Sequence, residues 1–111
     1  MTVLKAGPEP PDAMIWIDHE QAIIAMRQRD GAPFVERLGR GAFEPESAFE
    51  ARAVDELVDS GTVTVAGPAF ARTSFERALV AVTHRPDRII DVEPWMDAPD
   101  VADLPARRRH R

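Results

Sequence analysis

The sequence predicts a single α/β domain built on a mixed five-stranded sheet, in which three strands precede two helix–strand units. The length of 111 residues fits one domain, and 44% hydrophobic with 30% charged residues allows a modest core beneath a solvated surface. Isoleucine- and valine-rich runs occupy the first third of the chain and recur after residue 60. Apolar residues at helical spacing fill the stretches that separate the later strands.

The first expected elements are three strands joined by two tight turns. Residues 14–17 are apolar on both faces, which is typical of a central strand covered on two sides. An isoleucine-rich strand is expected over residues 22–27, and the polar residues 18–21 indicate a hairpin. Arg29-Asp30-Gly31 signals the next turn. The third strand, residues 34–38, follows a proline and carries charges, which favours the edge of the sheet.

The first helix is expected over residues 47–60. Ser47 and Glu50 match a capping box, in which the serine oxygen accepts an amide hydrogen bond and the glutamate reaches back to the helix start. Apolar residues follow at helical spacing with charged residues between them, which predicts one buried face. Gly61 is expected to end this helix in a left-handed cap.

A short β-branched strand over residues 62–66 leads to the second helix. Gly67-Pro68 breaks the strand, and Thr73-Ser74-Phe75-Glu76 offers another capping box at the start of a helix over residues 72–85. A proline at position 86 stops that helix, and residues 89–92 form the last strand. The helix faces expected to be buried are centred on Phe49, Leu57, Phe75 and Leu79.

The expected order is therefore β-β-β-α-β-α-β, which is the order of the ribonuclease-H-like fold. A strand–helix–strand step favours a right-handed parallel connection, so the antiparallel first half joins a parallel second half in one mixed sheet. The ordered domain is expected over residues 13–93. Residues 1–12 form a proline-rich, disordered lead-in, and residues 94–111 form an acidic, proline-containing segment with a basic tail.

Charge is distributed unevenly along the chain. The net charge is −5, and four arginines among the last five residues leave −9 on residues 1–106. An acidic body argues against broad phosphate binding, because nucleic-acid affinity needs a positive surface. The basic tail is the obvious electrostatic contact for RNA or an acidic partner, and the alternative is a terminus that only aids solubility. The tail arginines are Arg107, Arg108, Arg109 and Arg111.

Cysteine and long apolar segments are absent from the sequence. Without cysteine the chain has no disulfide, thiolate nucleophile or zinc–thiolate site. No apolar run approaches the roughly 20 residues that cross a membrane, and the first residues lack the pattern of a signal peptide. A reducing, cytoplasmic location is the expectation, and no cofactor or membrane partner is predicted.

Asp18, His19 and Glu20 interrupt two apolar runs and raise the choice between a reactive site and a turn. Catalysis would need an oriented third group or a nucleophile, and no serine or threonine lies in a strained Gly-x-Ser-x-Gly turn. With only His84 and His110 elsewhere, His19 has no metal-ligand spacing. The expected role is a hairpin turn, with surface recognition by Asp18 and His19 as the alternative.

Arg72 and Thr73 are expected at a helix start beyond the carboxyl end of a strand. Anions bind at such places in α/β sheets, and Arg72 would reinforce the site. The alternative is a solvated arginine beside a threonine that serves only as a cap. Trp16 is expected in the core, whereas Trp95 is expected to hold the tail or to form part of a partner surface.

Three segments resemble a known family: "MIWIDHEQAIIA", "VTVAGPAFARTSFERAL" and "RIIDVEPW". They are similar to small bacterial proteins that look like the middle domain of archaeal and eukaryotic peptide-chain release factors and of Pelota, the ribosome-rescue relative. The resemblance covers roughly residues 13–93, and its most specific parts are Trp16-Ile17-Asp18-His19 and Gly67-Pro68 followed by Arg72-Thr73. It implies a translation-associated role in contact with the ribosome or tRNA.

The sequence departs from the release factors at the loop that carries out peptidyl-tRNA hydrolysis, so this activity is not expected. Release factors carry a Gly-Gly-Gln loop between the third strand and the first long helix, whereas this chain has Gly39-Arg40-Gly41-Ala42-Phe43 there. A two-metal nuclease, the second enzyme class suggested by the fold, needs converging carboxylates. Asp18 and either Glu46 or Glu50 could supply two of them, but the strand before Gly67 ends without an acid. No catalytic residue and no metal ligand is therefore predicted.

Two functional hypotheses remain. The first is a non-catalytic translation-associated module that contacts the ribosome or tRNA through Arg72, Thr73 and the tail arginines Arg107, Arg108 and Arg109. The second is a protein-interaction or homodimeric assembly module that uses the strand edge at residues 34–38. Salt separates them, because phosphate contacts weaken steeply with ionic strength and apolar strand pairing does not.

Overall fold

The computed structural model describes residues 12–27 and 33–91. The elements are β1 (Ala13–Ile17), β2 (Gln21–Arg27), β3 (Pro33–Gly39), α1 (Glu46–Leu57), β4 (Val63–Ala66), α2 (Ala69–Thr83), the 3-10 turn η2 (Pro86–Arg88) and β5 (Ile89–Asp91). The expected β-β-β-α-β-α-β order is confirmed, although individual boundaries shift by up to three residues.

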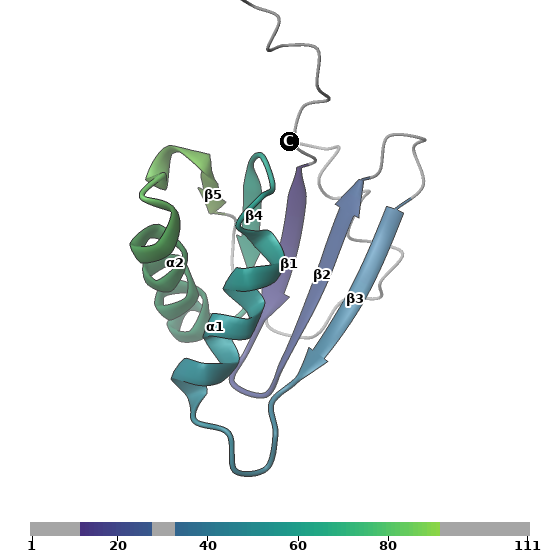
Figure 1. Cartoon of the computed structure of the whole chain (residues 1–111), viewed down its shortest axis with the longest axis vertical. Helices are drawn as coiled ribbons and strands as arrows, with labels where there is room; N and C mark the ends of the chain where they lie inside the picture. The colour runs from purple at the N-terminus through teal and green to yellow at the C-terminus, as the bar shows by residue number, and fades with distance from the viewer. Residues whose placement is uncertain (1–11, 28–32, 92–111) are drawn as a thin grey trace, which may run out of the picture.

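All five strands form one mixed sheet in the order β3-β2-β1-β4-β5 (Figure 1). β1 pairs antiparallel with β2 and parallel with β4, so the strand that is apolar on both faces is central, as predicted. Its Ile15 lies between Ile24 of β2 and Val65 of β4. β3 lies at one edge, which also confirms the expectation drawn from its charges and leading proline.

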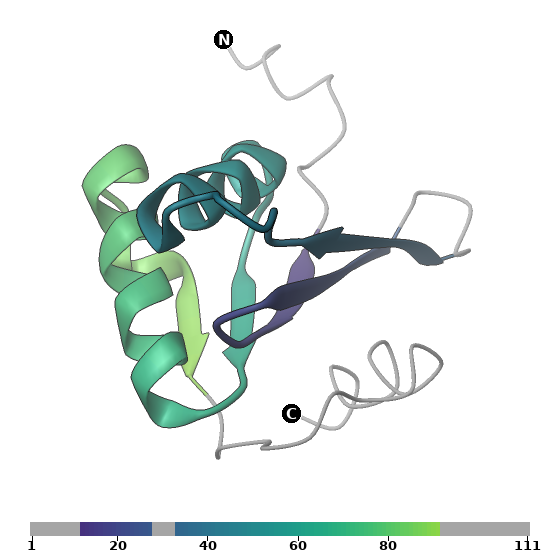
Figure 2. The ribbon, with the colours of Figure 1, turned by 90° about the horizontal axis from the view of Figure 1, so that it is seen from below.

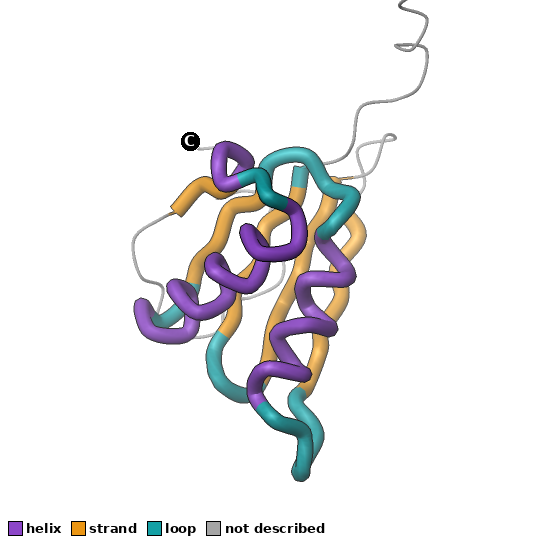
Figure 3. Tube along the Cα trace, turned by 60° about the vertical axis from the view of Figure 1, so that its left-hand side comes forward, coloured by secondary structure: helices purple, strands orange, loops and turns teal. Residues whose placement is uncertain are grey.

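Both helices cover the same face of the sheet, as Figures 2 and 3 show from two directions. They pack against each other, and the Ser74 hydroxyl of α2 donates a 2.5 Å hydrogen bond to the Glu50 carboxylate of α1. The predicted apolar stripes supply the core beneath them. Phe49, Leu57, Phe75 and Leu79 are all buried, with exposures of 0–2%.

The opposite face of the sheet carries a second apolar cluster. It consists of Met14, Trp16, Ile23, Ala25 and Ala66, with the half-buried Val35 against it. Trp16 is 1% exposed, so its predicted place in the core is confirmed. The alternation of side chains along β1 sends Ile15 and Ile17 to the helix-covered face and Trp16 to this one.

The predicted caps of α1 are wrong. The helix begins at Glu46, directly after Pro45, and no side chain caps it. Ser47 lies exposed in the first turn because Pro45, with φ −62° and ψ 149°, already provides the extended residue that precedes a helix. At the other end the Ser60 hydroxyl donates 2.6 Å to the Leu57 carbonyl. Gly61 does not form the expected left-handed cap.

The predicted start of α2 is wrong for the same reason. Pro68, with ψ 139°, precedes the first helical residue, Ala69, so Thr73 lies inside the helix and does not cap it. The helix ends in a left-handed residue, His84, with φ 57°. The His84 amide donates 2.7 Å to the Val80 carbonyl, which satisfies one of the free carbonyls of the last turn.

Several expectations concern residues outside the described ranges. They are the turn at Arg29-Asp30-Gly31, the lead-in before Asp12, the segment over residues 94–111, Trp95 and the tail arginines. These remain predictions. Within the described part of the chain, no helix has the length and apolar character needed to cross a bilayer.

Candidate functional site

The connecting segments of the sheet converge at the end where β1, β3 and β4 finish (lower end of Figure 1). The turn between β1 and β2, the loop between β3 and α1, and the Gly67-Pro68 link between β4 and α2 all lie there. Ligands of α/β sheets commonly bind beyond the carboxyl ends of strands. We call this region the carboxyl-end surface, defined by His19, Arg40, Phe43, Glu46 and Phe70.

Asp18 builds the hairpin turn between β1 and β2. One of its carboxylate oxygens accepts hydrogen bonds from the Glu20 amide at 2.8 Å and the Gln21 amide at 2.9 Å. The Asp18 amide in turn donates 3.0 Å to the Gln21 carbonyl, which closes the turn. The segment is therefore a hairpin, and the oxygen of Asp18 that accepts both amides has a structural role.

His19 joins three elements that are distant in sequence. Its Nδ1 donates to the Glu46 carboxylate at the start of α1, and its ring lies 5.6 Å from that of Phe70 in the first turn of α2. Its backbone carbonyl accepts a 3.2 Å hydrogen bond from Arg40 of the next loop. His19 is exposed, so this cluster lies on the surface.

The loop over residues 40–45 is held in place by hydrogen bonds to the carboxylate of Glu44. Arg52 of α1 donates to both oxygens of Glu44, at 2.9 and 2.8 Å, and also to the Gly39 carbonyl at 2.7 Å. The Gly41 amide adds a 2.8 Å hydrogen bond to the same carboxylate. These donors, Arg52 first, lower the pKa of Glu44 to about 2. The paired geometry fixes both ends of the loop.

Phe43 is presented at the tip of this loop. It is 99% exposed, and Phe70, in the first turn of α2, is 75% exposed. Phe43 thus lies on a loop whose position is fixed, and loops on rigid scaffolds commonly carry recognition. Neither ring was predicted from the sequence to be a contact residue. The sequence did offer one sign of Phe43. It is an aromatic residue between Gly41 and Pro45, outside the strand and helix patterns that supply the core.

Arg72 and Thr73 do not lie at the start of α2, where they were predicted to be. α2 begins three residues earlier, and the Arg72 amide already donates 2.9 Å to the Pro68 carbonyl inside the first turn. Arg72 is half-buried. Thr73 is exposed and lines a shallow surface groove with Ala69, Phe70, Ser74 and Arg77. Of the predicted Asp18–His19 pair, His19 contacts α2, through the ring of Phe70.

The acidic side chains at this end do not converge. One Asp18 oxygen accepts the turn amides, Glu46 faces His19, and β4 ends in Ala66 followed by Gly67. Over residues 12–27 and 33–91, no three histidine, cysteine, aspartate or glutamate side chains lie where they could hold a metal ion.

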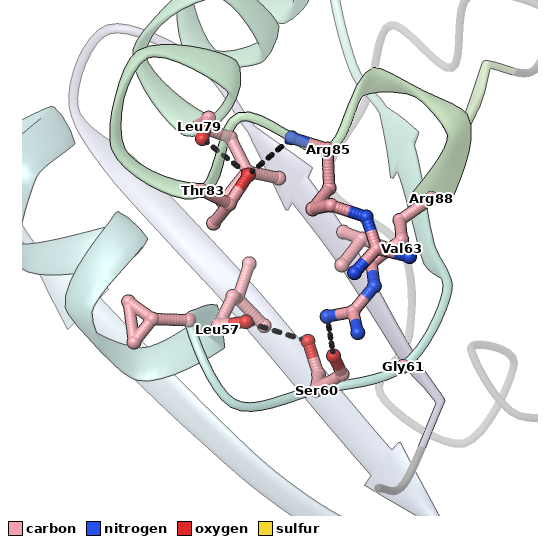
Figure 4. Close-up of a pocket in the computed structure, with 9 residues that line it drawn as sticks. Leu57, Ser60, Gly61, Val63, Leu79, Thr83, Arg85 and Arg88 are labelled. Carbon is pink, nitrogen blue, oxygen red and sulfur yellow. Dashed lines mark hydrogen bonds between the residues drawn. The ribbon is translucent and has the colours of Figure 1, made fainter.

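A small cavity lies at the other end of the helix pair, where α1 and α2 finish (Figure 4). It measures about 10 Å³, room for about one water molecule. Arg88 donates 2.9 Å to the Ser60 carbonyl, and Thr83 donates 2.8 Å to the Leu79 carbonyl. The first bond ties η2 to the segment that follows α1, and the second lies within the last turn of α2, so the cavity belongs to the structural packing of the domain.

Substituting Glu44 is expected to make the loop anchor visible as a pH-dependent loss of stability. Because folding lowers the Glu44 pKa from 4.5 to about 2, the ionised side chain stabilises the fold above about pH 4.5. That contribution is lost as the pH falls through about 2. Glu44→Gln should therefore melt below the wild type at pH 7, and the difference should shrink on acidification.

Circular-dichroism melting curves between pH 7 and pH 2 measure this effect. Asp59→Asn, which alters an exposed carboxylate just beyond α1, is the matched control and should show a much smaller difference. A difference between wild type and Glu44→Gln that is unchanged across the whole range would contradict the anchor.

Solved structures of two archaeal Pelota proteins are similar to this chain. The protein of Archaeoglobus fulgidus matches with a TM-score of 0.64 at 17% identity, over 95% of this chain and 33% of that chain. The protein of Thermoplasma acidophilum matches with a TM-score of 0.62 at 20% identity, over 85% of this chain and 30% of that chain. No family model and no curated protein matches the sequence.

A third solved structure, of an archaeal protein, matches with a TM-score of 0.52 at 19% identity, over 78% of this chain and 30% of that chain. At these identities the similarity shows the fold. The chain has a Pelota-like α/β fold and spans about a third of the length of the Pelota chains it matches.

Proposed function

We propose that this chain is a non-catalytic, translation-associated module that contacts the ribosome or tRNA through its carboxyl-end surface. The observation that carries the proposal is the anchored loop with Phe43 at its tip, on a fold shared with part of Pelota, a release-factor-like protein. In the release factors that the sequence resembles, the loop at this position is the one that enters the peptidyl-transferase centre. We place the contact there and assign no hydrolysis, because the loop lacks Gly-Gly-Gln.

The chemistry of the surface suits contact with unpaired RNA bases. Exposed aromatic rings stack on bases with little sequence preference, and stacking one base is worth about 1–3 kcal/mol. Phe43 and Phe70 supply such rings. The acidic body offers few phosphate contacts, so we assign these to Arg107, Arg108 and Arg109, with Arg72 as a lesser contributor. The expected complex is weak and sensitive to salt.

Ribosome co-sedimentation at low salt tests the proposal. Phe43→Ala should raise the apparent Kd for ribosomes, measured by titrating the ribosome concentration, at least about fivefold if one base is stacked, since about 1 kcal/mol corresponds to that ratio. Val82→Ala is the matched control, because Val82 is 57% exposed near the end of α2 away from this surface. Removing residues 106–111 should weaken the salt dependence, and Arg72→Ala should have a smaller effect than Phe43→Ala.

Recovery of the wild-type protein only in the supernatant at every salt concentration would contradict ribosome contact. Mg²⁺-dependent cleavage of RNA or DNA that disappears in Asp18→Asn would contradict the non-catalytic assignment. Because the proposed partners, the ribosome and tRNA, are cytoplasmic, we also propose a cytoplasmic location for the protein.

The outer position of β3 favours one alternative, a homodimeric assembly module. Among the described residues no further strand pairs with its outer edge, and Phe34 is 43% exposed there. Unpaired edges invite pairing with another chain, although the charges of Glu36 and Arg37 oppose it. A dimer in sedimentation equilibrium that resists salt and disappears in Phe34→Glu would favour this alternative.

A further inference from the structure

The face of the sheet opposite the helices is buried although neither helix covers it. Met14, Trp16, Ile23, Ala25 and Ala66 are between 0 and 4% exposed. The core residues of α1 and α2 belong to the cluster on the other face, and Figures 2 and 3 show both helices on that side. We refer to this surface as the second face.

A bare sheet face cannot bury these side chains. Side chains stand roughly perpendicular to a sheet, so Trp16 and Met14 would be solvated unless another layer lay on them. The Thr64 hydroxyl, next to Met14 in the register, is also buried and has no hydrogen-bond partner. An uncovered patch of this apolar character would be a liability for a soluble domain.

We propose that residues 92–104 of the same chain form this third layer. The chain leaves β5, the strand beside β4, at residue 91, so these residues start at the edge of the second face. Crossing from β5 to β2 takes three strand spacings, about 15 Å. Thirteen residues reach about 20 Å even as a helix, and further when extended. The apolar residues available are Val92, Trp95, Met96, Val101 and Leu104.

Charge complementarity supports the same occupant. Arg37 is exposed and continues the row of the second face that runs through Ile23, Trp16 and Ala66. Residues 92–104 carry three aspartates between their apolar residues, at positions 97, 100 and 103. A segment that places its apolar residues on the second face could place these aspartates near Arg37. Residues 1–11 fit less well, since they are proline-rich and contain no aromatic residue.

The two tryptophans allow a direct test in the full-length chain. In Trp16→Phe, Trp95 is the only fluorophore of its kind. Packing on the second face should give Trp95 a blue-shifted emission and an acrylamide quenching constant several-fold below that of the urea-unfolded protein. Quenching equal to that of the unfolded protein would overturn the proposal.

The converse variant reports on the covered residue. In a Trp95→Phe background, Trp16 should be poorly quenched, and adding Met96→Asp should make it accessible. Leu4→Asp is the matched control at the other terminus and should leave Trp16 shielded. Loss of the Trp16 shielding with Leu4→Asp instead would overturn the assignment to residues 92–104. Shielding that appears only at high protein concentration would indicate a second copy of the chain and would overturn it as well.

The third layer does not depend on ribosome contact, and the two are tested separately. Trp95 quenching is measured without ribosomes, so a failure of co-sedimentation leaves the third layer intact, and the reverse also holds.

Discussion

Replacing Gly67 with alanine is expected to lower the free energy of unfolding by about 4 kcal/mol or more, which is among the largest effects a single substitution produces. Gly67 has a φ of 127°, which side chains rarely tolerate. A Cβ there would overlap the Ile17 carbonyl oxygen and lie 3.2 Å from the Ile17 nitrogen. Both atoms belong to the central strand, so neither can move without disturbing the sheet.

Urea unfolding followed by circular dichroism measures the loss. Gly39→Ala is the matched control, because a Cβ at Gly39 meets nothing within 4 Å, and its effect should stay within about 0.5 kcal/mol. If Gly67→Ala does not fold, its recovery in the soluble fraction of an expression host, compared with Gly39→Ala, gives the same ranking. Equal stability of the two variants would contradict the close approach of Gly67 to β1.

The second large effect is expected at Phe75. Its side chain is 0% exposed in the core between α2 and the sheet, so Phe75→Ala should cost about 3–5 kcal/mol through lost burial and the cavity left behind. Phe70 lies in the same helix but is 75% exposed, so Phe70→Ala should change stability by about 0.5 kcal/mol or less. The two variants carry the same substitution in the same helix, so they differ mainly in the burial of the side chain that is removed.

Thermal and urea unfolding measure the stability of both variants relative to the wild type. A loss at Phe70→Ala comparable to that at Phe75→Ala would mean that α2 is rotated relative to the face described. The pair also serves the functional test, since Phe70→Ala alters the carboxyl-end surface of an intact fold.

The strands and the buried helix faces could be predicted because their burial follows local periodicity. The doubly apolar run of β1 indicated a central strand, and the stripe from Phe49 to Leu57 indicated a covered helix face; both are confirmed. The helix starts could not be read from the serine and threonine patterns. Each helix instead begins one residue after a proline, Pro45 or Pro68, whose fixed φ provides the entry to the helix.

The candidate site was predictable only in part. The turn role of Asp18 followed from its residue type, because a short carboxylate accepts amides two and three residues ahead. The contacts of His19 with Glu46 and Phe70 depend on the convergence of β1, α1 and α2, which no local pattern encodes. The anchored position of Phe43 likewise depends on Arg52, which lies in the following helix.

We expect the central place of β1 to impose an order on the folding of the sheet. Its antiparallel partner β2 follows after a short turn, so that pair closes early, on the microsecond scale of hairpins. Its parallel partner β4 lies beyond α1 in the chain, and the Asp12–Thr62 hydrogen bonds beside that pair join residues 50 positions apart, so we expect this pairing to form later. Until β4 docks, the inner edge of β1 stays open to any other strand. Before β4 has docked, a nascent chain can therefore pair only three strands, with its most apolar strand at an edge, and we expect slower α1–β4 docking to lengthen the exposure of that edge to aggregation.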